Sequence, residues 1–205
     1  MLRTHQTTRE EPISVTLDIR LATDPELDPR GFAATLIQGQ QDLSRAEAIN
    51  PIWHWSPMVI PGPLQTRRCA QNTISALPDL VRPEEVEQLI ADRMARGKAM
   101  AMTEGATQRR FVLTDWLLGR PFADPQAVQE QRRHIADLDA LDHIQVRVLP
   151  SNACVHLFHP VQVVGDQALT EGPRGMVSMP GGAETYLPHF DRLWQAAIDY
   201  SDWSD

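Results

Sequence analysis

Apolar and polar residues alternate without exception over residues 13–21. The five apolar positions are Ile13, Val15, Leu17, Ile19 and Leu21. A period of two residues is typical of a half-buried strand, so we predict an edge or antiparallel strand here. Two prolines and a glycine follow this segment, and apolar residues that include Leu43 and Ala46 then recur at helical spacing. This spacing predicts a helix that ends before Asn50-Pro51.

The middle of the chain predicts helices that alternate with short strands. A short helix over 64–76 follows the Pro61-Gly62 break, and a longer one starts at Pro83 with two acidic residues in its first turn. Residues 111–119, FVLTDWLLG, predict a buried strand that runs into a turn. The helix that follows has an inward face, and its members are Val128, Gln131, Ile135 and Leu138. A strand over 143–150 comes next, and a strand, helix, strand order favours a parallel pair.

Two more strands and a final helix complete the pattern. The strands fall in 159–165 and 175–180, with a loop that contains glycine and proline between them. The final helix has Pro188 in its first turn, and its inward residues are Leu187, Phe190, Leu193, Trp194, Ala197 and Ile198. We therefore predict a mixed α/β fold, with a small, mostly central mixed sheet of about four to five strands packed by helices. Residues 1–41 form a strand and helix extension, and residues 42–205 form the main part of what we expect to be one compact domain.

Composition and charge exclude several classes of protein. The chain has 205 residues, of which 42% are hydrophobic, and its formal net charge is −8. A protein that binds a phosphate backbone by itself needs a basic face, so direct nucleic-acid binding is disfavoured. No apolar stretch approaches the roughly 20 residues that cross a bilayer, and the N-terminus has no secretory signal. Cys69 and Cys154 make no disulfide framework, which favours the cytoplasm.

Five motifs together resemble one known family. They are MVIPGPLQTRRCAQ at 58–71, ADRMARGK at 91–98, FVLTDWLLGRP at 111–121, QEQRRHIADL at 129–138 and IQVRVLP at 144–150. Their order and spacing resemble the C-terminal domain of unknown function that lies behind an N-terminal helix-turn-helix in many actinomycete regulators of the xenobiotic-response-element type, often described as antitoxin-like. The resemblance covers about residues 42–200, and Ile60-Pro61-Gly62 with Leu64-Gln65-Thr66 is its most specific part.

The chain departs from that family pattern in two ways. Pro63 replaces a leucine, Gly97 replaces a glutamine and Asp115 replaces a glutamate. In addition, an independent DNA-binding domain needs roughly 50 residues, and residues 1–41 contain a strand pattern where two helices joined by a tight turn would stand. The resemblance therefore implies the second half of a regulator without direct DNA readout.

Several side chains are candidates for ligand binding. Trp53 and Trp55 face the same side of an extended segment and could form an aromatic wall, although we favour a role at the edge of the core. Gln65 and Thr66 follow the Pro-Gly break, where free N–H groups can hold an anion or a carbonyl, and an ordinary helix cap is the favoured alternative. Trp116 is a further aromatic candidate.

Three polar side chains are predicted to face inward, namely Arg93, Asp115 and Gln131. Buried polar groups need hydrogen bonds, so these three either satisfy one another in a structural network, which we favour, or converge on a ligand. Gly97 lies one turn after Arg93 and is expected to leave open space beside it.

Cys154, His156 and His159 form the most reactive cluster in the sequence. On a strand, Cys154 and His156 point to one face and His159 to the other, so we predict no metal site unless the segment turns after Leu157. Glu171 could act as a general acid or base if it faced a pocket. The chain has none of the usual nucleotide, serine hydrolase or zinc peptidase motifs, and we predict no cofactor.

Three hypotheses of function follow. The first is a regulatory or sensor module that does not bind DNA and takes a small apolar or aromatic ligand or a protein partner, with a homodimer among the options. The second is a cofactor-free cyclase, isomerase or lyase of specialised metabolism, in which Asp115, His156 or Glu171 would move protons. The third is an inactive remnant or a pure dimerisation unit.

Overall fold

The computed structural model describes residues 41–76, 81–102, 107–119, 125–153, 159–172 and 175–203. The strand predicted over 13–21 lies outside these residues, and the predicted boundary near residue 41 stays a prediction. Within the described part, no helix is long and apolar enough to cross a bilayer.

A seven-stranded mixed sheet forms the centre of the described fold, with the strand order β6-β5-β4-β1-β2-β3-β7. The strands are β1 (Ile52–Ser56), β2 (Arg109–Thr114), β3 (Ile144–Leu149), β4 (Val161–Val164), β5 (Gln167–Gly172), β6 (Gly175–Ser178) and β7 (Ile198–Asp199). β1, β2 and β3 are parallel, whereas β4, β5, β6 and β7 pair with their neighbours in the antiparallel sense.

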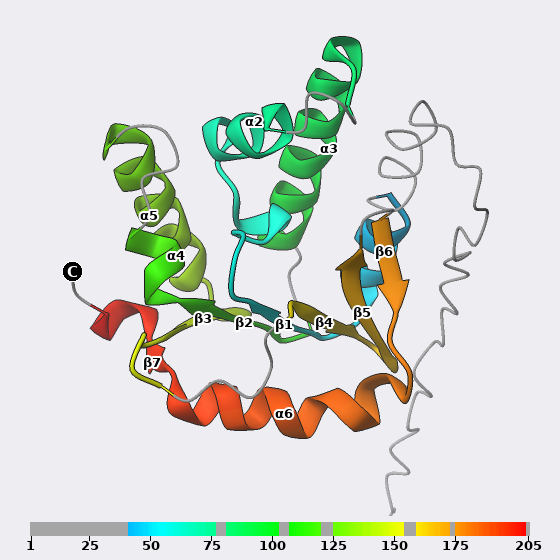
Figure 1. The fold of residues 1–205 in the computed structure, drawn as a ribbon, viewed down its shortest axis with the longest axis vertical. Helices are drawn as coiled ribbons and strands as arrows, with labels where there is room; N and C mark the ends of the chain where they lie inside the picture. The colour runs from blue at the N-terminus through cyan, green and yellow to red at the C-terminus, as the bar shows by residue number, and fades with distance from the viewer. Residues whose placement is uncertain are drawn as a thin grey trace, which may run out of the picture.

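Helices cover both faces of the sheet (Figure 1). They are α2 (Arg67–Ser75), α3 (Pro83–Met102), α4 (Asp115–Gly119), α5 (Pro125–Asp139) and α6 (Gly182–Ala196), with short 3-10 turns η1 (Gly62–Leu64) and η2 (Tyr200–Asp202). Residues 41–49 are also helical. The connections from β1 to β2 and from β2 to β3 place α2, α3 and α5 on one face, while α6 crosses the other face alone.

The hydrophobic pattern explains both layers of the core. On one face, the inward residues predicted for α5 are buried, and Ile135 and Leu138 pack against Ile144 and Val146 of β3. On the other face, Phe190 and Leu193 of α6 pack against strand residues, which are Trp55, Val112 and Leu149. The mixed α/β class and the parallel β2 and β3 pair are thus confirmed.

The number of strands was underestimated because three strands were missed. β1 was predicted only as an extended segment, β5 lies where we predicted a loop, and β7 lies where we predicted the final helix. The final helix also differs from the prediction. α6 begins at Gly182, so Pro188 lies in its second turn and not in its first. Ile198 was predicted to point inward from this helix, but it belongs to β7 and is 40% exposed.

The predicted helix over 64–76 is split into η1 and α2. Gln65 and Thr66 are extended between these two elements, and the Thr66 side chain caps α2 by accepting a hydrogen bond from the Cys69 amide. This break turns the chain from the end of β1 into α2.

Candidate functional site

The carboxyl ends of β1, β2 and β3 lie along one edge of the sheet because the three strands are parallel. The segments 57–61, 115–119 and 150–153 leave the strands there, and we call this place the carboxyl edge. In open α/β sheets, ligands bind beyond the carboxyl ends of the strands. The carboxyl edge is therefore the first place to look for a site.

Side-chain hydrogen bonds tie these three segments together. The Thr114 hydroxyl donates to the Pro57 carbonyl at 3.0 Å, which joins the ends of β2 and β1. The Asp115 carboxylate accepts from the Trp116 amide at 2.5 Å and from the Ser151 amide at 2.7 Å, which joins the ends of β2 and β3. Because both carboxylate oxygens are used, Asp115 serves to hold the backbone of the edge.

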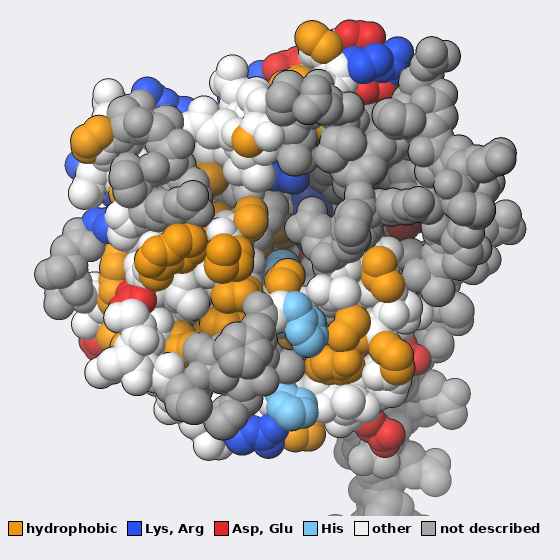
Figure 2. All heavy atoms as spheres, in the orientation of Figure 1, with side chains coloured by type: hydrophobic (Ala, Val, Ile, Leu, Met, Phe, Trp, Pro, Cys, Tyr) orange, Lys and Arg blue, Asp and Glu red, His pale blue; other side chains and the backbone are white. Residues whose placement is uncertain are grey.

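Large apolar side chains are exposed on this framework. Met58 is 55% exposed, Val59 42% and Trp116 48%. The register pairs Ser56 with Leu113, so the residues that follow on each strand lie on neighbouring segments. We call these three residues the edge cluster. Figure 2 shows hydrophobic side chains gathered over the central strands, and a group of exposed apolar side chains marks a binding surface.

A polar network behind the edge holds the segment from β1 to α2. Gln65 donates to the Ile60 carbonyl at 2.8 Å and accepts from Arg93 of α3 at 2.8 Å. Gln131 of α5 accepts from the Thr66 amide at 2.8 Å and donates to the Leu64 carbonyl at 2.6 Å. The side-chain amides of Gln65 and Gln131 thus connect this segment to α3 and α5.

The predicted trio of Arg93, Asp115 and Gln131 is therefore divided. Arg93 and Gln131 support the same segment through different partners, whereas Asp115 bonds at the carboxyl edge. The open space expected at Gly97 is absent, because a Cβ there would lie 2.8 Å from the Pro63 carbonyl oxygen. Gly97 instead lets α3 approach the backbone at η1.

Trp53 and Trp55 do point to the same side of β1, but α6 covers that side. Trp55 is 1% exposed and packs against Phe190 and Leu193 of α6, and Trp53 contacts the same cluster. These contacts agree with the favoured interpretation of two tryptophans at the edge of the core. Neither belongs to the edge cluster.

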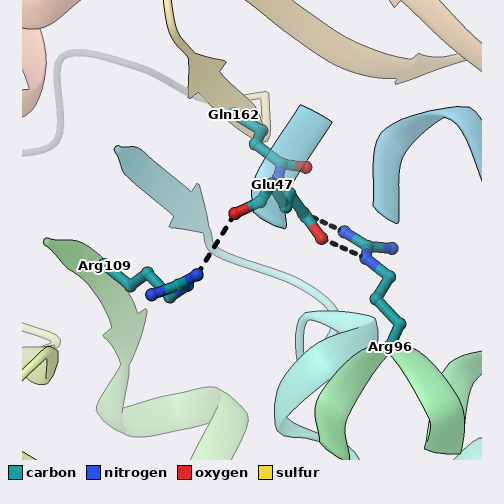
Figure 3. Close-up of polar contacts among 4 residues, drawn as sticks. All are labelled: Glu47, Arg96, Arg109 and Gln162. Carbon is teal, nitrogen blue, oxygen red and sulfur yellow. Dashed lines mark hydrogen bonds and ion pairs between the residues drawn. The ribbon is translucent and has the colours of Figure 1, made fainter. Parts of the chain in front are cut away.

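The sequence-based prediction missed a buried charged cluster on the opposite side of β1, shown in Figure 3. Glu47 and Arg96 form a two-pronged ion pair, in which the Arg96 Nε lies 2.5 Å from one carboxylate oxygen and Nη2 contacts the other. Gln162 of β4 donates to the same carboxylate. Arg109 of β2, which is fully buried, donates to the Glu47 carbonyl at 3.2 Å. One signal was available, since Glu47 follows the apolar Leu43 at helical spacing.

His54 extends this cluster along β1. It is paired in register with Gln162 on one side and with Phe111 on the other, and its ring lies 5.9 Å from that of Phe111. Burial, and to a lesser degree the nearby Arg96 charge, lower the pKa of His54 to about 3. The imidazole is therefore neutral at physiological pH.

The remaining candidates are dispersed. Cys154 and His156 lie outside the described residues, and His159 is exposed. Glu171 is in β5, which β4 and β1 separate from β2 and Asp115, and only its backbone is described. Burial raises the pKa of Cys69 to about 11, so that thiol is protonated at neutral pH. The described residues contain no group of three or more metal-binding side chains.

A groove of about 800 Å³ follows the outer face of α5. Its lining residues are Thr66, Pro125, Gln126, Gln129, Glu130, Arg133, His134 and Asp137. Burial lowers the pKa of His134 although Asp137 and Glu130 oppose this shift. The lining of the groove carries both signs of charge and has no large apolar side chain comparable to those of the edge cluster.

Comparison with known proteins identifies one match. A family model described as a domain of unknown function (DUF5753) matches residues 41–201, which is most of the chain and almost all of its described part. No curated protein and no solved structure matches the chain.

Proposed function

The chain belongs to the family of the domain of unknown function DUF5753, and we propose that this member is a regulatory binding module without catalytic activity. Its carboxyl edge takes an apolar or aromatic group, which either a small molecule or a protein partner presents. The protein acts in the cytoplasm and leaves DNA contacts to other molecules.

The edge cluster is the observation that carries this proposal. Met58, Val59 and Trp116 are half-exposed, although they sit on a backbone that hydrogen bonds fix in place. Covering such side chains with another molecule removes apolar surface from water, which favours binding, and a rigid support reduces the entropy lost on binding. Met and Trp are also enriched in the centres of protein interfaces.

The regulatory part of the proposal rests on the sequence. The motifs from Met58 to Pro150 resemble the C-terminal domain of unknown function of helix-turn-helix regulators, and the net charge of −8 opposes direct contact with DNA. The same charge favours a partner with a basic surface by electrostatic complementarity.

The contacts of Asp115 argue against the alternative of a cofactor-free enzyme. Each of its carboxylate oxygens accepts a backbone hydrogen bond, which gives this carboxylate a structural role at the carboxyl edge. Glu171 belongs to a strand that is three places away from β2 in the sheet.

The test uses the fluorescent apolar probe anilinonaphthalene sulfonate with the full chain. We expect Trp116→Ala to weaken probe binding at least about fivefold, because it removes the largest side chain of the edge cluster. The matched control is Ile49→Ala, which truncates a half-exposed apolar side chain that precedes β1, at the opposite end of that strand from the carboxyl edge. Equal binding by the two variants would contradict the proposed site.

Native mass spectrometry of the gently purified chain separates the two sources of the apolar group. A bound organic molecule that Trp116→Ala loses supports a small ligand, and a bound second protein that the same variant loses supports a protein partner. Steady turnover of any retained molecule would refute the proposal that the module is non-catalytic.

A further inference from the structure

Strand β6 forms one end of the described sheet. It pairs with β5 through four residue pairs from Gly172 and Gly175 to Leu169 and Ser178, and within the described residues no strand pairs with its other side. In Figure 1, β6 stands at the far side of β5 from the centre of the sheet. An open strand edge is a template for another strand, and proteins usually cover it.

The backbone groups that face outward from β6 can be assigned. The Met179 amide donates to the Ala168 carbonyl of β5 at 2.7 Å. Because successive residues of a strand direct their backbone groups to opposite sides, Val177 also faces β5. The N–H and C=O groups of Met176 and Ser178 therefore point away from β5, where they can receive a further strand.

The N-terminal part of the chain enters the fold beside this edge. Leu43 and Ala46, in the helix over 41–49, pack against Val164, Leu169 and Met176 of β4, β5 and β6. Residues that precede position 41 therefore approach the fold from the end of the sheet where β6 lies.

We propose that residues 13–21 of the same chain bind along β6 as an eighth strand. Their unbroken alternation makes one apolar and one polar face, which suits the rim of a sheet that is covered on one side. The apolar face lies on the side of Met176 and extends the cluster that Met176 forms with Leu43 and Leu169.

The connection allows this arrangement without a second chain. Residues 22–40 supply 19 residues between the new strand and the helix over 41–49, and such a segment can span up to about 60 Å. Since the two parts belong to one molecule, the effective concentration of the segment at the edge is high, which favours the chain's own segment over that of a neighbour.

Hydrogen exchange of the full chain tests this proposal. We expect the Met176 and Ser178 amides to be protected, and Leu17→Asp to speed their exchange at least about tenfold because a charge enters the apolar face. The matched control is Thr16→Asp, which places the same charge on the polar face and should change exchange by less than about threefold. The Val112 amide of β2, which lies between β1 and β3, reports that the fold persists.

Three results would overturn the proposal. The first is unprotected Met176 and Ser178 amides in the unchanged protein, and the second is an equal response to Leu17→Asp and Thr16→Asp. The third is protection that exists only in a dimer, measured across protein concentrations with sedimentation as the monitor, since a second copy would then occupy the edge. None of these readouts depends on the edge cluster, so they are independent of the proposed function.

Discussion

Two regions of the molecule reverse the usual distribution of side chains. On the side of β1 that faces away from α6, the charged side chains of Glu47, Arg96 and Arg109 are buried. At the carboxyl edge, Met58 and Trp116 place large apolar groups in water. The first region thus buries charged groups, and the second exposes apolar ones.

The two regions differ in the interactions that their side chains make. Glu47 and Arg96 neutralise each other, and the Glu47 carboxylate also accepts from Gln162. Arg109 donates to the backbone carbonyls of Glu47 and Thr107, and its buried Nε has no hydrogen-bond partner among the described residues. The side chains of the edge cluster are instead between 42% and 55% exposed. The first region thus supports the fold, and the second is the surface that we propose for binding.

The largest effect is expected from Glu47→Gln. The substitution keeps the shape of the side chain but leaves the Arg96 guanidinium buried without its counter-charge, which should lower the free energy of unfolding by about 3–5 kcal/mol. Urea denaturation measures this loss. The control is Asp42→Asn, which breaks the exposed pair with Arg45 and should cost less than about 1 kcal/mol. Similar losses of unfolding free energy in both variants would show that the buried cluster stabilises the fold no more than the exposed ion pair does.

A smaller effect is expected from Gly97→Ala. The new methyl group would lie 2.8 Å from the Pro63 carbonyl oxygen, so α3 and η1 must move apart at a cost of about 1–3 kcal/mol. Gly119→Ala is the control, since a Cβ there meets nothing within 4 Å. If the framework behind the edge is needed for binding, Gly97→Ala also weakens the fluorescent probe, whereas Gly119→Ala does not. An unchanged melting temperature in Gly97→Ala would contradict the close approach.

The smallest effect concerns pH and His54. Because its pKa falls from 6.5 to about 3 on folding, the unfolded state binds the proton more readily between these values. The free energy of unfolding should therefore fall as the pH drops below about 6.5, by up to about 1.4 kcal/mol per pH unit.

Denaturation of His54→Gln between pH 6.5 and 5 checks this linkage, and the slope should be shallower than in the unchanged protein. The control is His159→Gln, which replaces an exposed imidazole and should keep the slope. A slope that persists in His54→Gln would assign the pH dependence to other groups.

Much of the fold could be predicted because burial leaves a periodic pattern. Gln131 was placed on the inward face of α5 from its spacing relative to Ile135 and Leu138. β5 was missed because residues 167–172 contain a threonine, a glutamate and a terminal glycine, and such a strand has a weak apolar signal. Its existence depends on pairing with β4 and β6, which is a long-range effect.

The candidate site was only partly predictable for a related reason. Trp116 was selected as an aromatic candidate, but Met58 and Val59 were not, because no local pattern shows whether an apolar residue in a loop is buried or exposed. Their exposure follows from the position of the carboxyl edge, which depends on the parallel pairing of β1 and β2. The Glu47 cluster joins residues from four elements, and no local pattern reveals such a set.

The position of α6 in the order of synthesis has a consequence for how the protein is made. This helix packs against β1, β3, β4 and β5, and all four precede it in the sequence. As the chain leaves the ribosome, Trp53, Trp55 and Val112 lack the cover that α6 provides in the described fold until this helix emerges. A nascent chain stalled before Gly182 would therefore expose the aromatic side chains on this face of the sheet to chaperones. We expect chaperone binding to the nascent chain to end once α6 has been synthesised and has packed on the sheet.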